Sequence, residues 1–157
     1  MRRIFAGLFA ITLAMPIFAV VHSVEVHQLL AILAMKQKIA ALTLDACGGS
    51  FDRDLILFPI DQHIPATIFA TKRWIIANPA AVSVIEAHPD LLEIEDHGAN
   101  HVPALIGAGR RVYGILGEPD VAHLRQEVVE GVRAVESISG ILPHWYRDAT
   151  AEYIRRQ

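Results

Sequence analysis

The sequence is poor in several features that would point to particular classes of protein. It has a single cysteine, Cys47, so no disulfide can form within one chain. Its 14 basic and 17 acidic residues give a net charge of −3, with no long run of either sign, which excludes a strongly basic surface for nucleic acid. It also lacks internal repeats and low-complexity tracts. A length of 157 residues therefore indicates one domain, and a small or neutral substrate suits it best.

Charge is also missing from residues 4 to 21, a run of 18 residues that follows Arg2 and Arg3. A positive start, an apolar stretch and the small residue Ser23 are typical of a secretory signal. We therefore expect residues 1–23 to form a signal peptide and the protein to be exported, to the periplasm or beyond. The run also just reaches the length of a spanning helix, so an uncleaved membrane anchor that faces the rest of the chain outward is the alternative.

Strand-like and helix-like segments alternate along the remaining chain, which predicts an α/β fold with a parallel sheet. Strands are expected close to residues 39–44, 65–71, 91–97 and 143–149, with a long loop over residues 98–117. Helices are expected over residues 51–62, 73–88 and 119–139. Proline should kink or shorten the first helix at Pro59 and divide the second at Pro79.

The longest predicted helix, residues 119–139, has a regular apolar pattern. Pro119 suits its first turn and Gly140 suits its end. At helical spacing, one stripe contains Val121, Leu124, Val128, Val132 and Val135. This stripe is expected to face the core.

An acidic residue ends the first predicted strand, in the stretch "LTLDACGG". Asp45 follows a short apolar run of the kind that fills a buried parallel strand, and Gly48 and Gly49 allow the chain to turn. Parallel sheets place their chemistry at the carboxyl ends of strands, which makes Asp45 a candidate site residue. The alternative is an acid that only caps a helix or a turn.

Two histidines follow the third predicted strand, in the stretch "HGANH". His97 and His101 can converge on one metal ion if the intervening turn is tight, and Gly98 favours such a turn. The ends of neighbouring parallel strands lie close together, so Asp45 is expected nearby. The alternative is a chance pair of surface histidines.

An arginine lies in the last predicted strand, in the stretch "WYRDATAEY". The guanidinium of Arg147 could hold the carboxylate of Asp45 through two parallel hydrogen bonds. The alternative is a surface ion pair between Arg147 and Asp148.

The order of the four stretches "LTLDACGG", "IPATIFAT", "EIEDHGANH" and "WYRDATAEY" resembles the polysaccharide deacetylase family. This family is also known as the NodB-homology family or carbohydrate esterase family 4, and the resemblance covers about residues 38–153. It implies an incomplete (β/α) barrel with about four parallel strands and flanking helices. It also implies hydrolysis of N-acetyl or O-acetyl groups on an oligosaccharide or polysaccharide, with a divalent metal that is typically zinc.

The resemblance assigns roles to individual residues. It implies that Asp45 is the catalytic base and that Arg147 orients this base. It implies further that His97 and His101 bind the metal.

Two positions depart from the family pattern. Ala46 stands where the family has an aspartate that is the third metal ligand, and Gly98 stands where a hydroxyl residue is usual. A thiolate of Cys47 could replace the missing ligand. Because strand alternation directs adjacent side chains to opposite faces, we instead expect Cys47 to be buried and inert.

The sequence ends at Gln157, directly after the third family motif. We therefore expect about four strands of a barrel, an exposed apolar sheet edge that favours self-association, and little deacetylase turnover. The alternative to an exported deacetylase is a non-catalytic remnant of residues 24–157 that binds carbohydrate or metal, or that has no independent function.

Overall fold

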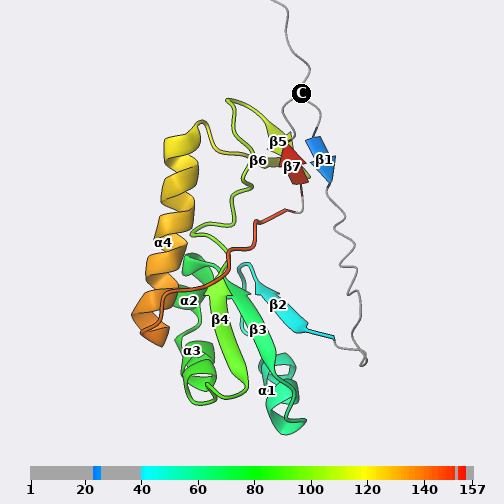
Figure 1. The fold of residues 1–157 in the computed structure, drawn as a ribbon, viewed down its shortest axis with the longest axis vertical. Coiled ribbons are helices and arrows are strands. Elements are labelled where there is room, and N and C mark those ends of the chain that lie inside the picture. Colours follow the sequence, from blue (N-terminus) through cyan, green and yellow to red (C-terminus); the bar gives the residue numbers. More distant parts are fainter. Residues whose placement is uncertain (1–22, 26–39, 151, 155–157) are drawn as a thin grey trace, which may run out of the picture.

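A computed structural model describes residues 23–25, 40–150 and 152–154 of the chain. At its centre lies a parallel sheet with the strand order β2–β3–β4 (Figure 1). The strands are β2 (Leu42–Ala46), β3 (Ala66–Ala70) and β4 (Leu92–Asp96). Leu42 pairs with Ala66 and Ala66 with Leu92, so the three strands begin and end at the same level. The predicted α/β class with a partial (β/α) sheet is confirmed, and all carboxyl ends meet at one edge.

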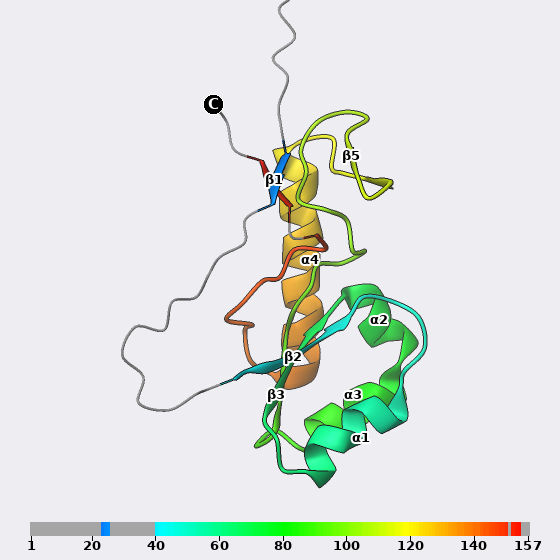
Figure 2. The same ribbon diagram turned by 90° about the vertical axis from the view of Figure 1, so that its right-hand side faces the viewer.

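Within the described residues, four helices flank the sheet, and Figure 2 shows α1, α2 and α3 together on one side of the strands. The helices are α1 (Arg53–Asp61), α2 (Lys72–Ala77), α3 (Pro79–Glu86) and α4 (Val121–Ser139). The division at Pro79 is as predicted. Helix α1 runs through Pro59 and ends two residues later, because a proline in the last turn removes only one helical hydrogen bond.

The hydrophobic core fills the space between these helices and one face of the sheet. Its sheet residues include Ile68 and Ile94, and its helix residues include Ile75, Ile85 and Val135. The opposite face carries the side chains of three residues that pair across the strands, Asp45, Phe69 and Glu95. Because side chains alternate along a strand, this second face is separate from the core and is free to carry polar groups.

Strand β2 differs from the predicted buried strand. Leu42 is 36% exposed and Asp45 is exposed as well. Among the described residues β2 has a neighbouring strand on one side only, so it is the edge of the sheet. Asp45 also lies within β2 rather than after it.

The predicted fourth strand is not a regular strand. Tyr146 instead forms a single parallel bridge with Asp96. The amide of Asp96 donates to the carbonyl of Trp145 at 3.2 Å, and the amide of Arg147 donates to the carbonyl of Asp96 at 2.9 Å. These two bonds bring Arg147 to the carboxyl end of β4.

Two short antiparallel pairs are the remaining strands in the part of the chain that the structure describes. The predicted loop contains a hairpin of β5 (Arg111–Val112) and β6 (Ile115–Leu116). Strand β1 (Ser23–Glu25) pairs with β7 (Glu152–Ile154). No helix in the described part of the chain is long and apolar enough to cross a membrane. The predicted signal peptide or anchor lies almost wholly outside the described residues.

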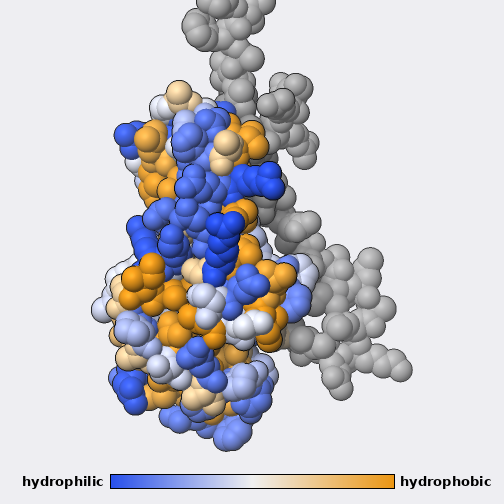
Figure 3. Space-filling view, turned by 90° about the vertical axis from the view of Figure 1, so that its left-hand side faces the viewer, coloured by the Kyte–Doolittle hydropathy of each residue, from blue (hydrophilic) through white to orange (hydrophobic). Residues whose placement is uncertain are grey.

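The buried face of α4 is rotated from the one that its apolar stripe predicts: Val135 is buried as predicted, and Leu124, Val128 and Val132 are half-buried. Its buried residues are Glu127, Gly131 and Val135, whereas Val121 is 65% exposed. The reason is a close approach at Gly131, since an added Cβ would collide with the Asp96 carboxylate and the Gly98 backbone. The outward surface of the helix is largely hydrophilic (Figure 3).

We predict that Gly131→Ala destabilises the protein, although alanine favours helices by about 1 kcal/mol over glycine. The added methyl group must displace α4 or the end of β4, so a net loss of about 1–3 kcal/mol in the free energy of unfolding is expected from urea denaturation. Arg133→Ala, at an exposed position two residues along, is the control and should remain close to wild type. Equal or greater stability of Gly131→Ala would contradict the close packing.

Candidate active site

Asp45 and Arg147 form an ion pair on the polar face of the sheet. Nη1 of Arg147 donates to Oδ1 of Asp45 at 2.6 Å, and both terminal nitrogens lie 3.2 Å from Oγ1 of Thr43. The guanidinium also stacks on the ring of Phe69, 3.9 Å from its centre. Arg147 therefore contacts Asp45 through one hydrogen bond rather than the two that were expected, because its second nitrogen is used by Thr43. The stacking and the three bonds fix the guanidinium, which in turn holds Oδ1 of Asp45 through one hydrogen bond.

His97 is only 2% exposed and lies directly beside this pair. Its Nδ1 is 2.8 Å from the carbonyl oxygen of Arg147. Since a carbonyl can only accept, Nδ1 carries the proton and Nε2 presents its lone pair. This is the arrangement in which a backbone carbonyl orients a metal-binding histidine.

His101 faces His97, with the two rings 4.9 Å apart at 67°. Burial lowers the pKa of His101, and His97 and Arg73 lower it further. This keeps the imidazole neutral, the form in which it binds metals. The backbone of His101 has φ 63°, a left-handed conformation that is uncommon outside glycine and is typical of functional sites.

The loop that carries both histidines is held by Glu127 of α4. This side chain is 4% exposed, and its carboxylate accepts hydrogen bonds from the amides of Asn100 and Val102 at 2.6 and 3.2 Å. It also accepts from Nδ2 of Asn100 at 3.0 Å. A buried carboxylate with three donors is a positioning group, which the sequence pattern did not reveal. The sequence does contain one sign of this role, since Glu127 is an acidic residue one turn before Gly131 and lies between apolar positions of an amphipathic helix.

The same contact explains why Gly98 departs from the family pattern. Its φ is 83°, and an added Cβ would lie 2.9 Å from Oε1 of Glu127. A serine there would be strained and would displace Glu127. The glycine is therefore required by the way in which α4 holds this loop.

Cys47 lies close to both histidines, contrary to the expected inert position. Its Sγ is 3.5 Å from Nε2 of His97, and the ligand atoms of Cys47, His97 and His101 lie within 4.8 Å of one another. Strand alternation does not apply to Cys47, because β2 ends at Ala46, one residue before the cysteine, and the expectation of a buried, inert thiol is therefore wrong. Ala46 itself packs against the core. One thiolate with two imidazoles is a donor set that suits zinc, so these residues fit a metal ion.

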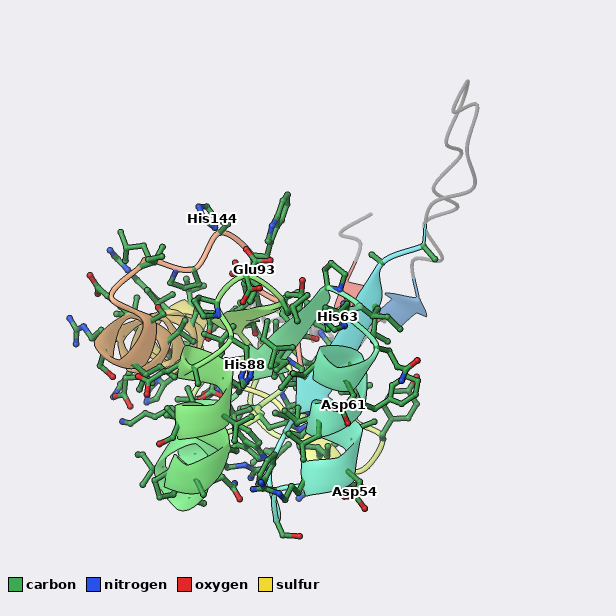
Figure 4. All side chains as sticks on the ribbon, turned by 90° about the horizontal axis from the view of Figure 1, so that it is seen from below. Asp54, Asp61, His63, His88, Glu93 and His144 are labelled. Atoms are coloured by element: carbon green, nitrogen blue, oxygen red, sulfur yellow. The ribbon has the colours of Figure 1, made fainter. Side chains whose placement is uncertain are left out.

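A second group of metal-capable side chains consists of Glu93, Glu95 and His144. Figure 4 shows Glu93 and His144 near each other. They help to line a hollow of about 1250 Å³ that includes neither His97 nor His101. One oxygen of each carboxylate is used within the fold, since Oε2 of Glu95 accepts from the amide of Trp145 at 2.7 Å and Oε2 of Glu93 from Oγ1 of Thr67 at 3.2 Å. The other oxygens pair with Nδ1 of His144, at 3.5 Å from Glu95 and 4.0 Å from Glu93. This group therefore stabilises the bridge segment and the sheet.

The fold and the grouping at the strand ends define a partial (β/α) domain with a candidate site at the carboxyl end of its sheet. The model of the family described as polysaccharide deacetylase matches residues 33–156, and the chain belongs to this family. The predicted family is thereby confirmed. A search of curated proteins finds no match.

Several solved structures share this fold. A polysaccharide deacetylase from Bacillus cereus is 18% identical with a TM-score of 0.52, over 72% of this chain and 48% of its own. A family 4 carbohydrate esterase from Bacillus anthracis is 17% identical with a TM-score of 0.52, over 73% and 49%. A mutant of a family 4 pseudoenzyme with restored enzymatic activity is 16% identical with a TM-score of 0.52, over 74% and 38%. The chain thus spans less than half the length of each, and the likeness shows the fold alone.

We predict that Glu127→Ala destabilises the protein by about 2–4 kcal/mol, because it leaves two backbone amides without their acceptor. Urea denaturation measures this loss. Glu127→Gln should retain most of the stability, since its amide oxygen can still accept both amides and the Asn100 side chain can turn. Glu130→Gln, which alters a surface pair with Lys72, is the matched control and should remain close to wild type. A fully stable Glu127→Ala would show that the loop does not depend on this residue.

Proposed function

We propose that the site at the carboxyl end of the sheet hydrolyses acetyl groups on a carbohydrate with the help of a divalent metal, zinc by preference. The observation that supports this most is the grouping of Asp45, Arg147, His97 and His101, four residues from three separate stretches, within one small site. Family membership supports the reaction class, and its substrates are acetylated oligosaccharides or polysaccharides. We propose further that the substrate of the whole protein is such a carbohydrate and that the protein is exported.

Each residue of the site has its own role in the proposed hydrolysis. His97 and His101 would hold the metal, which when bound supplies Lewis acidity toward an acetyl carbonyl. Asp45 accepts a proton from the attacking water, as a general base at the exposed edge of the sheet. Arg147 positions Asp45 with its guanidinium and positions His97 with its carbonyl oxygen. A single residue therefore sets the distance between the base and the metal-binding histidines.

A second candidate function is metal or carbohydrate binding without catalysis. The observation that favours it is Ala46, whose methyl group packs against the core and offers no ligand atom. One of the matched structures is described as a pseudoenzyme of the same family, so loss of activity occurs on this fold. We expect turnover to be low for this reason.

We predict that Asp45→Asn lowers acetate release from chitin oligomers or acetylated xylan by about 10²–10⁴-fold, the usual contribution of a general base. The zinc content of this variant should not change, because Asp45 acts as the base and is not one of the proposed metal ligands. Acetate assay and metal analysis of the purified full chain measure the two quantities separately. His97→Ala with His101→Ala should lower both.

The matched control is Asp61→Asn, an exposed acid at the end of α1 (Figure 4), shortly before β3 begins at the amino edge of the sheet, which is opposite to the site. It should leave acetate release unchanged. If Asp45→Asn releases acetate at the wild-type rate, Asp45 is not the base. If the wild type binds zinc and releases no acetate, the non-catalytic function is the correct one.

A further inference from the structure

Cys47 offers the third donor atom at a site where the two histidines alone would leave a metal weakly held. Three donor atoms, Sγ of Cys47 and one ring nitrogen each of His97 and His101, lie within 4.8 Å of one another. We propose that Cys47 binds the metal as a thiolate, so that the site is a Cys-His-His centre. This inference rests on the proposed function, because it assumes that His97 and His101 bind a metal.

The distance between Cys47 and His97 already suits two ligands of one ion. With zinc–sulfur and zinc–nitrogen bonds of about 2.3 and 2.05 Å and a tetrahedral angle, two such ligand atoms lie roughly 3.6 Å apart. The observed separation between Sγ of Cys47 and Nε2 of His97 is 3.5 Å. The hydrogen bond from Nδ1 to the Arg147 carbonyl directs the lone pair of Nε2 away from the backbone, toward this space.

The backbone of Cys47 is fixed by the neighbouring helix rather than by its own side chain. Its carbonyl oxygen accepts hydrogen bonds from Oγ1 of Thr71 and Nε of Arg73, both at 2.9 Å. Two bonds to one carbonyl hold the residue just beyond the end of β2. The thiol is therefore positioned independently of any metal, and substitution of its side chain should leave the loop in place.

A catalytic thiol with His97 as its base is the competing explanation of the same contact. That explanation gives no role to His101, whose ring centre lies 4.9 Å from that of His97. A metal accounts for all three donors, and it removes the thiol proton to solvent on binding. A soft thiolate ligand should make the site favour zinc and cobalt(II) over magnesium and manganese.

The test is titration of the purified full chain with cobalt(II) and zinc(II), followed by ultraviolet and visible absorption. The wild type should show a near-ultraviolet band of thiolate-to-cobalt charge transfer, which can come only from Cys47 because the chain has no other cysteine. Cys47→Ser should lose this band and bind zinc about 100-fold more weakly. Cys47→Asp should lose the band and keep much of the zinc affinity, since a carboxylate is also a ligand. Zinc should slow alkylation of the wild-type thiol by iodoacetamide.

The matched control moves the thiol to another position, so that the chain still contains one cysteine. In the Cys47→Ser protein, Ser50→Cys places a thiol at an exposed position three residues away, and the band should stay absent. If Cys47→Ser keeps the wild-type spectrum and zinc affinity while His97→Ala loses them, Cys47 is no ligand and the histidine site of the proposed function still stands. If the wild type binds neither metal, the proposed function fails together with this inference.

Discussion

Two backbone hydrogen bonds join Asp96, at the end of β4, to the segment around Tyr146, and the candidate site depends on them. They place Arg147 beside the carboxyl edge of the sheet, where its guanidinium meets Asp45 and its carbonyl meets His97. Asp45 and His97 are thus linked through different atoms of one residue. A shift of this segment would separate the base from the histidines, so the bridge controls the geometry of both.

Two acidic side chains near this site, those of Asp96 and Glu127, are buried close to each other. Asp96 is fully buried, and one of its oxygens accepts from the amide of Gly98 while the other has no hydrogen-bond partner among the described residues. The pKa of Asp96 is raised to about 6, chiefly by burial and also by the charges of Glu127 and Glu95, against the lowering effect of the Gly98 amide. Two buried carboxyl groups lower the free energy of unfolding. They stay buried because the end of β4 and helix α4 pack against each other around them.

Much of the fold and part of the site could be predicted from the sequence, because they depend on local patterns. Strand and helix periodicity gave the order of the elements, and the rule that parallel strands place chemistry at their carboxyl ends linked Asp45 to His97 and His101. Glu127 was missed because periodicity treats an acid in a helix as exposed, whereas contacts with a distant loop decide its burial. Cys47 was misplaced because alternation holds only within a strand, and no local pattern showed that β2 ends at Ala46. The pattern of residues 143–149 likewise predicts a full strand, where the structure has a single bridge at Tyr146.

The position of Cys47 also bears on how this chain differs from the rest of its family. An aspartate at position 46 would be anionic, and so would a metal-bound thiolate at position 47, so moving the third donor by one residue conserves the charge of the site. The donor would change from a hard carboxylate to a soft thiolate. It would also be attached to a loop beyond the strand rather than to the strand itself. Because Thr71 and Arg73 fix the carbonyl of Cys47 from α2 and its cap, the loop has a rigid support of its own. In the proposed Cys-His-His centre, a donor would therefore move from strand to loop without any change in His97, His101 or Arg147, and Ala46 would not by itself abolish metal binding.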